Sequence, residues 1–193
     1  GVLVSEDGVV LLGNYAMGGW MAMFSEVQVT PRDVKVMIGD DTEGVPATVI
    51  VRDSDRDLCW IKLDEAPEEP LPHLELSPDA SMPGVGERVY QVKRLDEFFG
   101  RATVVSESTV SATLSKPRDL LYVGMSAIEP GLPTVRSDGT FAGFAIIQRP
   151  SDEERSMGGG FGGGQFGSMI LAVLPASEVA SATEDALALA EEE

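Results

Sequence analysis

Few side chains in this sequence are suited to nucleophilic or acid–base chemistry. The chain has one histidine, His73, and one cysteine, Cys59. His73 lies in the segment L-P-H-L-E-L, where a solvated or capped structural role is the preferred interpretation. Cys59 lies between Leu58 and Trp60, which favours a buried and inert thiol. Ser126 and Ser137 are candidate nucleophiles, but a serine hydroxyl is activated only by an adjacent base.

Three carboxylates alternate along the segment D-S-D-R-D, at Asp53, Asp55 and Asp57. Calcium-binding loops use this spacing, but they also need a glycine where Leu58 stands and a bidentate glutamate where Asp64 stands. A single cysteine and a single histidine cannot build a zinc site either. The sequence therefore predicts a solvated turn before a strand, with no metal site and no cofactor.

The overall charge excludes some classes of partner. The 193 residues contain 14 basic and 32 acidic side chains, which gives a formal net charge of −18. A charge of this sign and size repels phosphate backbones and anionic lipids, so nucleic-acid and membrane-surface roles are not predicted. It favours solubility or basic partners.

One uncharged stretch, Gly8 to Ser25, has nearly the length of a membrane span. It contains Asn14 and several glycines and is flanked by Asp7 and Glu26, which disfavours a span. A buried strand and turn, followed by a short helix or loop, is the preferred interpretation.

Short apolar runs at even spacing predict an all-β protein. We expect strands within 2–4, 9–12, 27–29, 34–38, 47–51, 58–63, 88–92, 102–105, 109–114, 120–125, 134–135, 141–147 and 168–174. The segment Ser137-Asp138-Gly139 predicts a hairpin turn between two of them. Ser177 can cap a final helix through Ala190, and the acidic residues that follow should fray.

A proline- and acid-rich connector at residues 65–72 divides the chain. We expect a first β-barrel subdomain at residues 1–66 and a second at residues 67–176. Residues 177–193 then form a C-terminal helix and an acidic tail.

Several motifs, in order, resemble the trypsin-like serine proteases, nearest the bacterial high-temperature-requirement type. The opening G-V-L-V-S-E-D-G-V-V-L-L resembles the strand pair before that family's catalytic histidine, and D-S-D-R-D-L-C-W-I-K-L resembles its catalytic-aspartate motif. The segment P-T-V-R-S-D-G-T-F-A-G-F resembles the strands that follow its nucleophile loop. The resemblance implies a double six-stranded β-barrel with a C-terminal α-helix, and an exported or periplasmic location.

The resemblance also implies what stands at the catalytic positions. The histidine position falls on Tyr15 or, shifted by one, on Ala16, the aspartate position on Asp57, and the serine position on Pro130. Tyrosine has an ordinary pKa of about 10, too high for a general base near neutral pH. Proline has neither a hydroxyl nor a backbone N–H, so Pro130 removes both the nucleophile and one oxyanion-hole donor. The other donor position carries Ile128 in place of glycine.

These substitutions predict a catalytically inactive pseudoprotease that acts as a protein- or peptide-binding domain or scaffold. The alternative is a serine hydrolase with a relocated nucleophile, Ser126 or Ser137. A third hypothesis is a subunit of a larger assembly, because the family commonly has a strand before the segment that begins at Gly1.

The tract 158–167, G-G-G-F-G-G-G-Q-F-G, is too glycine-rich to be held by packing. It lacks the lysine and the serine or threonine of a phosphate-binding loop. The resemblance places it among loops that border the substrate cleft. Phe161 and Phe166 are therefore candidate partner-binding residues. The other interpretation is a disordered tract without a function.

Overall fold

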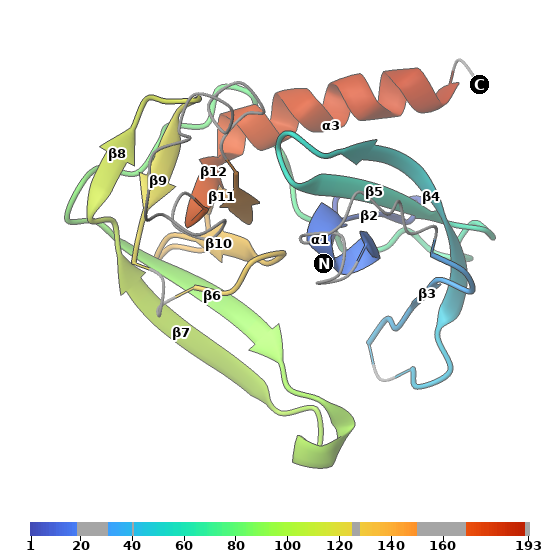
Figure 1. Ribbon diagram of the computed structural model, residues 1–193. Helices are drawn as coiled ribbons and strands as arrows, with labels where there is room; N and C mark the ends of the chain where they lie inside the picture. The colour runs from blue at the N-terminus through green and yellow to red at the C-terminus, as the bar shows by residue number, and fades with distance from the viewer. Residues whose placement is uncertain (19–30, 40, 125–127, 150–168, 192–193) are drawn as a thin grey trace, which may run out of the picture.

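The computed structural model describes residues 1–18, 31–39, 41–124, 128–149 and 169–191 and contains two β-sheets (Figure 1). The first sheet has five strands in the order β1-β2-β5-β4-β3. These are β1 (Val2–Leu3), β2 (Val9–Gly13), β3 (Lys35–Val36), β4 (Val45–Asp53) and β5 (Leu58–Leu63). A short helix, α1 (Asn14–Gly18), follows β2 directly.

The second sheet has seven strands in the order β7-β6-β10-β11-β12-β9-β8. They are β6 (Arg88–Arg94), β7 (Thr103–Thr109), β8 (Ala112–Leu114), β9 (Leu120–Tyr122), β10 (Pro133–Val135), β11 (Phe141–Gln148) and β12 (Ile170–Pro175). A one-turn 3-10 helix, η2 (Glu97–Phe99), lies between β6 and β7. Helix α3 (Ala176–Glu191) follows β12 without a loop.

The second sheet closes on itself, because β7 and β8 are two halves of one bent strand. Val110 continues the pairing with β6 by donating its N–H to Glu87 at 2.9 Å, and Ser111 begins the pairing with β9 by donating to Tyr122 at 2.7 Å. Counted as one strand, β7 and β8 reduce the seven strands to six, and the ring runs from β6 through β10, β11, β12 and β9 back to β6.

The apolar strands bury both of their faces, which explains why they read as unbroken hydrophobic runs. In β2, Val9 and Leu11 enter a core shared by the two sheets and α3, whereas Val10 enters the core of the first sheet. In β12, Ala172 and Leu174 enter the shared core and Val173 the core of the second sheet. The shared core holds the two sheets together.

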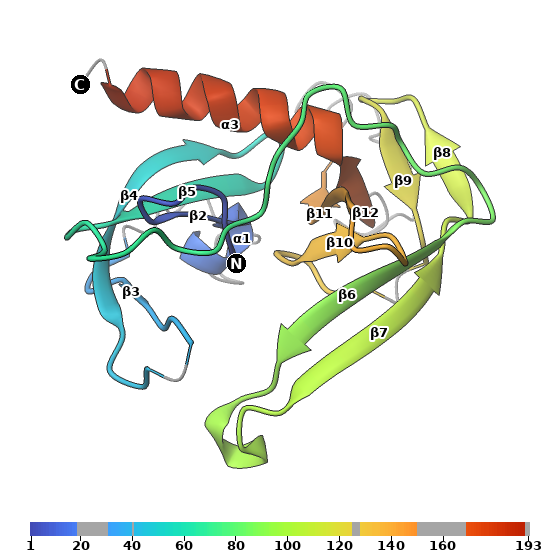
Figure 2. The same cartoon turned by 180° about the vertical axis from the view of Figure 1, so that it is seen from behind.

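Helix α3 lies across both sheets (Figures 1 and 2). Its small buried face contributes Ala176, Val179, Ala182 and Ala186 to the shared core. Trp60 of β5, 1% exposed, donates its indole N–H to the Thr183 hydroxyl at 3.1 Å, and that hydroxyl donates to the Val179 carbonyl at 2.8 Å. The helix is thereby tied to the first sheet, although it follows the last strand of the second.

The prediction of an all-β architecture with a C-terminal helix is confirmed. The first sheet has five strands among the described residues, and the strand expected at 27–29 lies outside them. The chain passes from one sheet to the other within residues 64–87. The division into subdomains at residue 66 stays a prediction. Within the described part of the chain, no helix is both long and apolar enough to cross a bilayer.

Candidate functional site

An open cleft of about 720 Å³ lies where the two sheets face each other. The first sheet and α1 contribute Leu12, Gly13, Tyr15 and Ala16, and the loop before β10 contributes residues 129–132. The end of the β6–β7 hairpin next to its turn contributes Val92, Lys93, Arg94 and Thr103. The cleft therefore contains two of the positions that the sequence singles out, Tyr15 and Pro130.

The Tyr15 side chain joins the two halves of the cleft. Its hydroxyl donates a hydrogen bond to the Pro130 carbonyl at 3.2 Å. A Cβ added to Gly13 would lie 2.9 Å from the Tyr15 ring, and one added to Gly131 would lie 3.5 Å from it. The ring therefore lies against two residues without side chains, one in each half of the cleft.

The ionisation of Tyr15 follows from this position. Partial burial of the phenol, with the nearby carboxylates of Asp57 and Glu129, raises the pKa of Tyr15 above its ordinary value. Each of these effects disfavours the phenolate. The hydroxyl therefore keeps its proton at neutral pH and remains a hydrogen-bond donor.

Asp57 lies behind Tyr15 in the turn between β4 and β5 and is 4% exposed. One carboxylate oxygen accepts from the backbone N–H of Tyr15 and the other from the backbone N–H of Ile147 in β11, both at 2.9 Å. Desolvation raises the pKa of Asp57, and the two backbone hydrogen bonds oppose that rise. Both oxygens are thus committed to the backbone, one to each half of the molecule.

The loop before β10 is anchored on both sides of Pro130. The Ile128 side chain is 6% exposed and packs in the core of the second sheet, beside Val89, Leu121 and Val173. Gly131 has a φ of 78°, in the region that favours glycine, and donates its N–H to the Ala145 carbonyl at 2.7 Å. Pro130, between these two anchors, has no N–H to offer a ligand.

Gln91 of β6 holds this loop in place. Its side chain is 3% exposed; the amide oxygen accepts from the Glu129 N–H at 2.8 Å, and the amide nitrogen lies 3.1 Å from the Glu129 carbonyl. The same nitrogen lies 3.3 Å from the Thr134 hydroxyl. Lys93, two residues further along β6, forms an ion pair with the Glu129 carboxylate. Residue Glu129 of the loop is therefore held at its backbone by Gln91 and at its carboxylate by Lys93.

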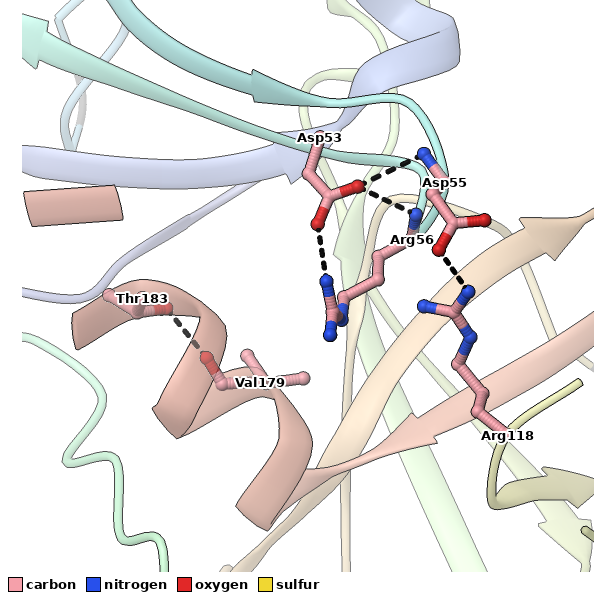
Figure 3. A network of polar contacts seen from close by, with 6 residues as sticks. All are labelled: Asp53, Asp55, Arg56, Arg118, Val179 and Thr183. Carbon is pink, nitrogen blue, oxygen red and sulfur yellow. Dashed lines mark hydrogen bonds and ion pairs between the residues drawn. The ribbon is translucent and has the colours of Figure 1, made fainter. Parts of the chain in front are cut away.

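A second polar network supports the turn that carries Asp57 (Figure 3). Asp53 accepts from the backbone N–H groups of Asp55 and Arg56, each at 3.0 Å, and pairs with the Arg56 guanidinium at 2.9 Å. Burial raises the pKa of Asp53, but the hydrogen bonds from Arg56 outweigh it, so the pKa is lowered overall. Asp55 forms an ion pair with Arg118, from the loop between β8 and β9. The turn is thereby tied to the second sheet.

Comparison with solved structures identifies the architecture. The MamO protease domain from Magnetospirillum magneticum, in its apo form, matches with a TM-score of 0.58 and 19% identity over 93% of this chain and 85% of that one. Rv3671c from M. tuberculosis H37Rv, a serine-to-alanine mutant in an inactive form, matches with a TM-score of 0.58 and 16% identity over 96% of this chain and 80% of that one. This chain has the trypsin-like serine protease fold. No protein-family model and no curated protein sequence matches it.

The trypsin-like fold brings the predicted site residues together in part. Tyr15 contacts both Asp57 and Pro130, although the three lie far apart in the sequence. Their assignment to the positions of the catalytic triad, and that of Ile128 and Pro130 to the oxyanion hole, stays a prediction. Ser137 lies exposed in the turn between β10 and β11 and is not among the residues that line the cleft.

Other predicted residues lie elsewhere. Ser126, Phe161 and Phe166 are outside the described residues. Cys59 is fully buried, and burial raises the pKa of its thiol to about 11, so it is a poor nucleophile at neutral pH. In the described residues no group of three or more His, Cys, Asp and Glu side chains is placed to hold a metal ion.

Sequence reasoning missed Gln91 and Lys93. The segment R-V-Y-Q-V-K-R alternates, and this alternation places Gln91 on the same face as the buried Val89. A glutamine on a buried face needs hydrogen-bond partners, which is the signal that the sequence offers. The partners themselves lie 38 residues or more away and could not be named from it.

Proposed function

We propose that this chain is a catalytically inactive trypsin-like domain that acts by binding a protein or peptide partner. The observation that carries the proposal is the hydrogen bond of the Tyr15 hydroxyl to the Pro130 carbonyl, at 3.2 Å. It joins, within one cleft, the two residues that the resemblance assigns to the histidine and serine positions.

The nucleophilic half of the reaction lacks its groups. Acyl transfer needs a hydroxyl or thiol at the attacking position and backbone N–H donors for the oxyanion. Pro130 supplies neither, and the Ile128 side chain is anchored in the core of the second sheet. A residual rate from oxyanion stabilisation alone is therefore not expected.

The acid–base half is compromised too. Both oxygens of the Asp57 carboxylate accept from backbone N–H groups, and the group beside it is a phenol whose pKa is raised. A phenol that retains its proton at neutral pH cannot take one from an attacking nucleophile. Asp57 is better described as a connection between the two halves of the fold.

The cleft persists beside Tyr15 and Pro130, which lack the chemistry of a base and a nucleophile. Its persistence favours a binding function over a catalytic one. The space of about 720 Å³ is lined by apolar surface from Leu12, Val92 and Leu132 and by the ion pair of Lys93 with Glu129. Clefts of this size with a few fixed polar groups accommodate ligand side chains. The net charge of −18 favours a basic partner. An exported location is proposed on the resemblance alone.

A fluorophosphonate probe tests the inactive half of the proposal. We expect no labelling of the folded chain, because Pro130 stands where the resemblance places the nucleophile. Stoichiometric labelling of Ser126 or Ser137, identified by mass spectrometry, would support the relocated-nucleophile alternative and overturn the proposal.

Selection of displayed peptides on the immobilised chain tests the binding half. Ala16 is exposed on α1 and lines the cleft, so Ala16→Arg fills the entrance without touching the core. Ser181→Arg, on the exposed face of α3, is the matched control. We expect Ala16→Arg to weaken binding of the selected peptides by at least about tenfold, and Ser181→Arg to leave it unchanged. Equal binding by both variants would place the binding site outside the cleft.

A further inference from the structure

The β6–β7 hairpin exposes an unusual share of apolar surface. Eight large hydrophobic side chains are exposed among the described residues, and four of them, Val92, Phe98, Phe99 and Val105, lie on this hairpin. Phe98 is 88% exposed and Val105 62%. Both views show the hairpin projecting away from the rest of the second sheet (Figures 1 and 2). Grouped apolar side chains on a projecting element are typical of interaction sites.

The tip of the hairpin has a defined conformation. Asp96 caps η2 and Gly100 closes it with a φ of 64°. The Phe98 and Phe99 rings meet edge to face at 5.1 Å between centroids. The turn therefore presents the aromatic pair in one defined arrangement.

The register shows which backbone groups of β7 are free. Leu95 donates to the Ala102 carbonyl at 2.9 Å, and Val110 donates to the Glu87 carbonyl at 2.9 Å. Hydrogen-bonded pairs alternate along an antiparallel ladder, so even-numbered residues of β7 face β6 and odd-numbered residues face away. Among the described residues, the N–H and C=O groups of Thr103, Val105 and Glu107 therefore point to an edge that β6 does not cover. Neither view shows another strand beside this edge (Figures 1 and 2).

We propose that the free edge of β7 binds an extended segment of a partner protein by strand addition. Main-chain hydrogen bonds to Val105 and Glu107, neither of which lines the cleft, supply affinity, and side chains at alternate positions supply specificity. The side chains of Val105 and Glu107 lie on the same exposed face of β7, so the basic residues of an alternating segment lie beside both of them, with an aliphatic stem against Val105 and a charge against Glu107. Glu107 is available to it, since its present ion pair with Arg88 is long, at 3.8 Å, and both side chains are at least half exposed.

Charge decides between a partner and a second copy of this chain. Self-association through β7 would bring together two chains of net charge −18. A basic, apolar-alternating segment meets no such repulsion, and the charge of the whole chain attracts it. The occupant is therefore a basic strand from another protein.

The test uses the full chain and a short peptide in which lysine and valine alternate, with an aspartate–valine peptide as the charge control. Glu107→Lys reverses the charge at the edge. Val105→Pro removes an outward N–H without removing a ladder bond, and proline is tolerated at such edge positions. Circular dichroism and thermal melting establish that each variant is folded; if Val105→Pro is not, Glu107→Lys alone decides.

We expect saturable binding of the lysine–valine peptide, with slower amide exchange at Val105 and Glu107. Both variants should weaken it by at least about tenfold, and Glu107→Lys should gain binding of the aspartate–valine peptide. Ala16→Arg, which blocks the cleft, should leave this binding unchanged, so failure here is distinct from failure of the proposed function. Absence of saturable binding, or equal binding by the wild type and both edge variants, would overturn the proposal. A wild-type dimer in light scattering that Val105→Pro dissociates would overturn it in favour of a second copy.

Discussion

The Asp57 carboxylate accepts the backbone N–H of Ile147 at 2.9 Å, across 90 positions of sequence. Asp57 belongs to a turn of the first sheet and Ile147 to a central strand of the second. The other carboxylate oxygen takes the N–H of Tyr15. One buried side chain thus connects β11 and α1, and its ionisation affects how firmly the cleft is assembled.

Asp57→Asn should change stability in a pH-dependent way. The folded-state pKa of Asp57 is raised by desolvation, so the folded chain binds more protons than the unfolded chain between the unfolded and folded pKa values. The contribution of Asp57 to stability is therefore fully present below the unfolded pKa and is lost as pH rises through the folded pKa. Asparagine leaves one buried N–H without an acceptor, which costs about 1–3 kcal/mol. We expect its destabilisation relative to wild type, from urea unfolding, to grow as the pH is lowered from neutral.

Asp138→Asn provides a control of opposite sign. Hydrogen bonding to Thr140 lowers the pKa of Asp138, so its contribution is present above the unfolded pKa and is lost as pH falls. The difference between wild type and Asp138→Asn should therefore shrink in acid. A pH-independent difference for Asp57→Asn would contradict the raised pKa.

Gly13→Ala should destabilise the chain through Tyr15. The new methyl group would lie 2.9 Å from the Tyr15 ring, closer than carbon atoms pack. The ring must therefore shift, which disturbs the hydrogen bond of its hydroxyl to the Pro130 carbonyl. Overpacking of this kind costs about 1–3 kcal/mol. Removing the ring should relieve the clash, so Gly13→Ala should cost less in a Tyr15→Ala background, as a double-mutant cycle of unfolding free energies would measure.

Gly84→Ala is the matched control for that cycle. No atom lies within 4 Å of a Cβ added at Gly84, and its φ is not in the left-handed region. We expect it to change stability by less than about 0.5 kcal/mol. Additive effects of Gly13→Ala and Tyr15→Ala would show that the ring does not depend on the glycine.

The sequence predicts the strands well where their burial requires a recognisable run of apolar residues. The runs V-V-L-L and L-C-W-I are apolar without alternation because β2 and β5 bury both faces, and Asp138-Gly139 marks its turn through local backbone preference. Helix α3 begins one residue before the predicted cap, Ser177. These features depend on neighbours in the sequence.

The contacts that assemble the cleft leave no such local pattern. Asp57 and Ile147 meet only because two sheets pack together, and β7 and β8 are one strand only because each half finds a different partner. The 3-10 turn that exposes Phe98 also escapes prediction, since one turn of helix has no periodicity to detect. The resemblance to a known family supplied the site positions that periodicity could not.

Gln91→Leu should loosen the loop that carries Pro130. It removes the partners of the Glu129 N–H and of the Glu129 carbonyl, whose hydrogen bonds with Gln91 are part-buried. We expect a loss of about 1–3 kcal/mol in unfolding free energy and faster amide exchange at Glu129 and Gly131. Gln148→Leu is the control, because Gln148 is equally buried but, among the described residues, its amide oxygen has no partner and its amide nitrogen donates only to the neighbouring Arg149 carbonyl, at 2.8 Å. A similar loss for both variants would show that the cost comes from side-chain volume.

Thr183→Val should detach α3 from the first sheet while preserving side-chain shape. The buried indole N–H of Trp60 loses its acceptor at 3.1 Å, and an unpaired buried donor costs about 1–3 kcal/mol. Thr48→Val removes a hydroxyl that also makes a hydrogen bond, to Asp64 at 2.7 Å, but on an exposed strand where water can replace it. The midpoint of urea unfolding should therefore be lower than that of the wild type for Thr183→Val and close to that of the wild type for Thr48→Val. If the two variants unfold alike, the Trp60 bond does not hold the helix, and apolar packing of Val179, Ala182 and Ala186 alone fixes α3 across the two sheets.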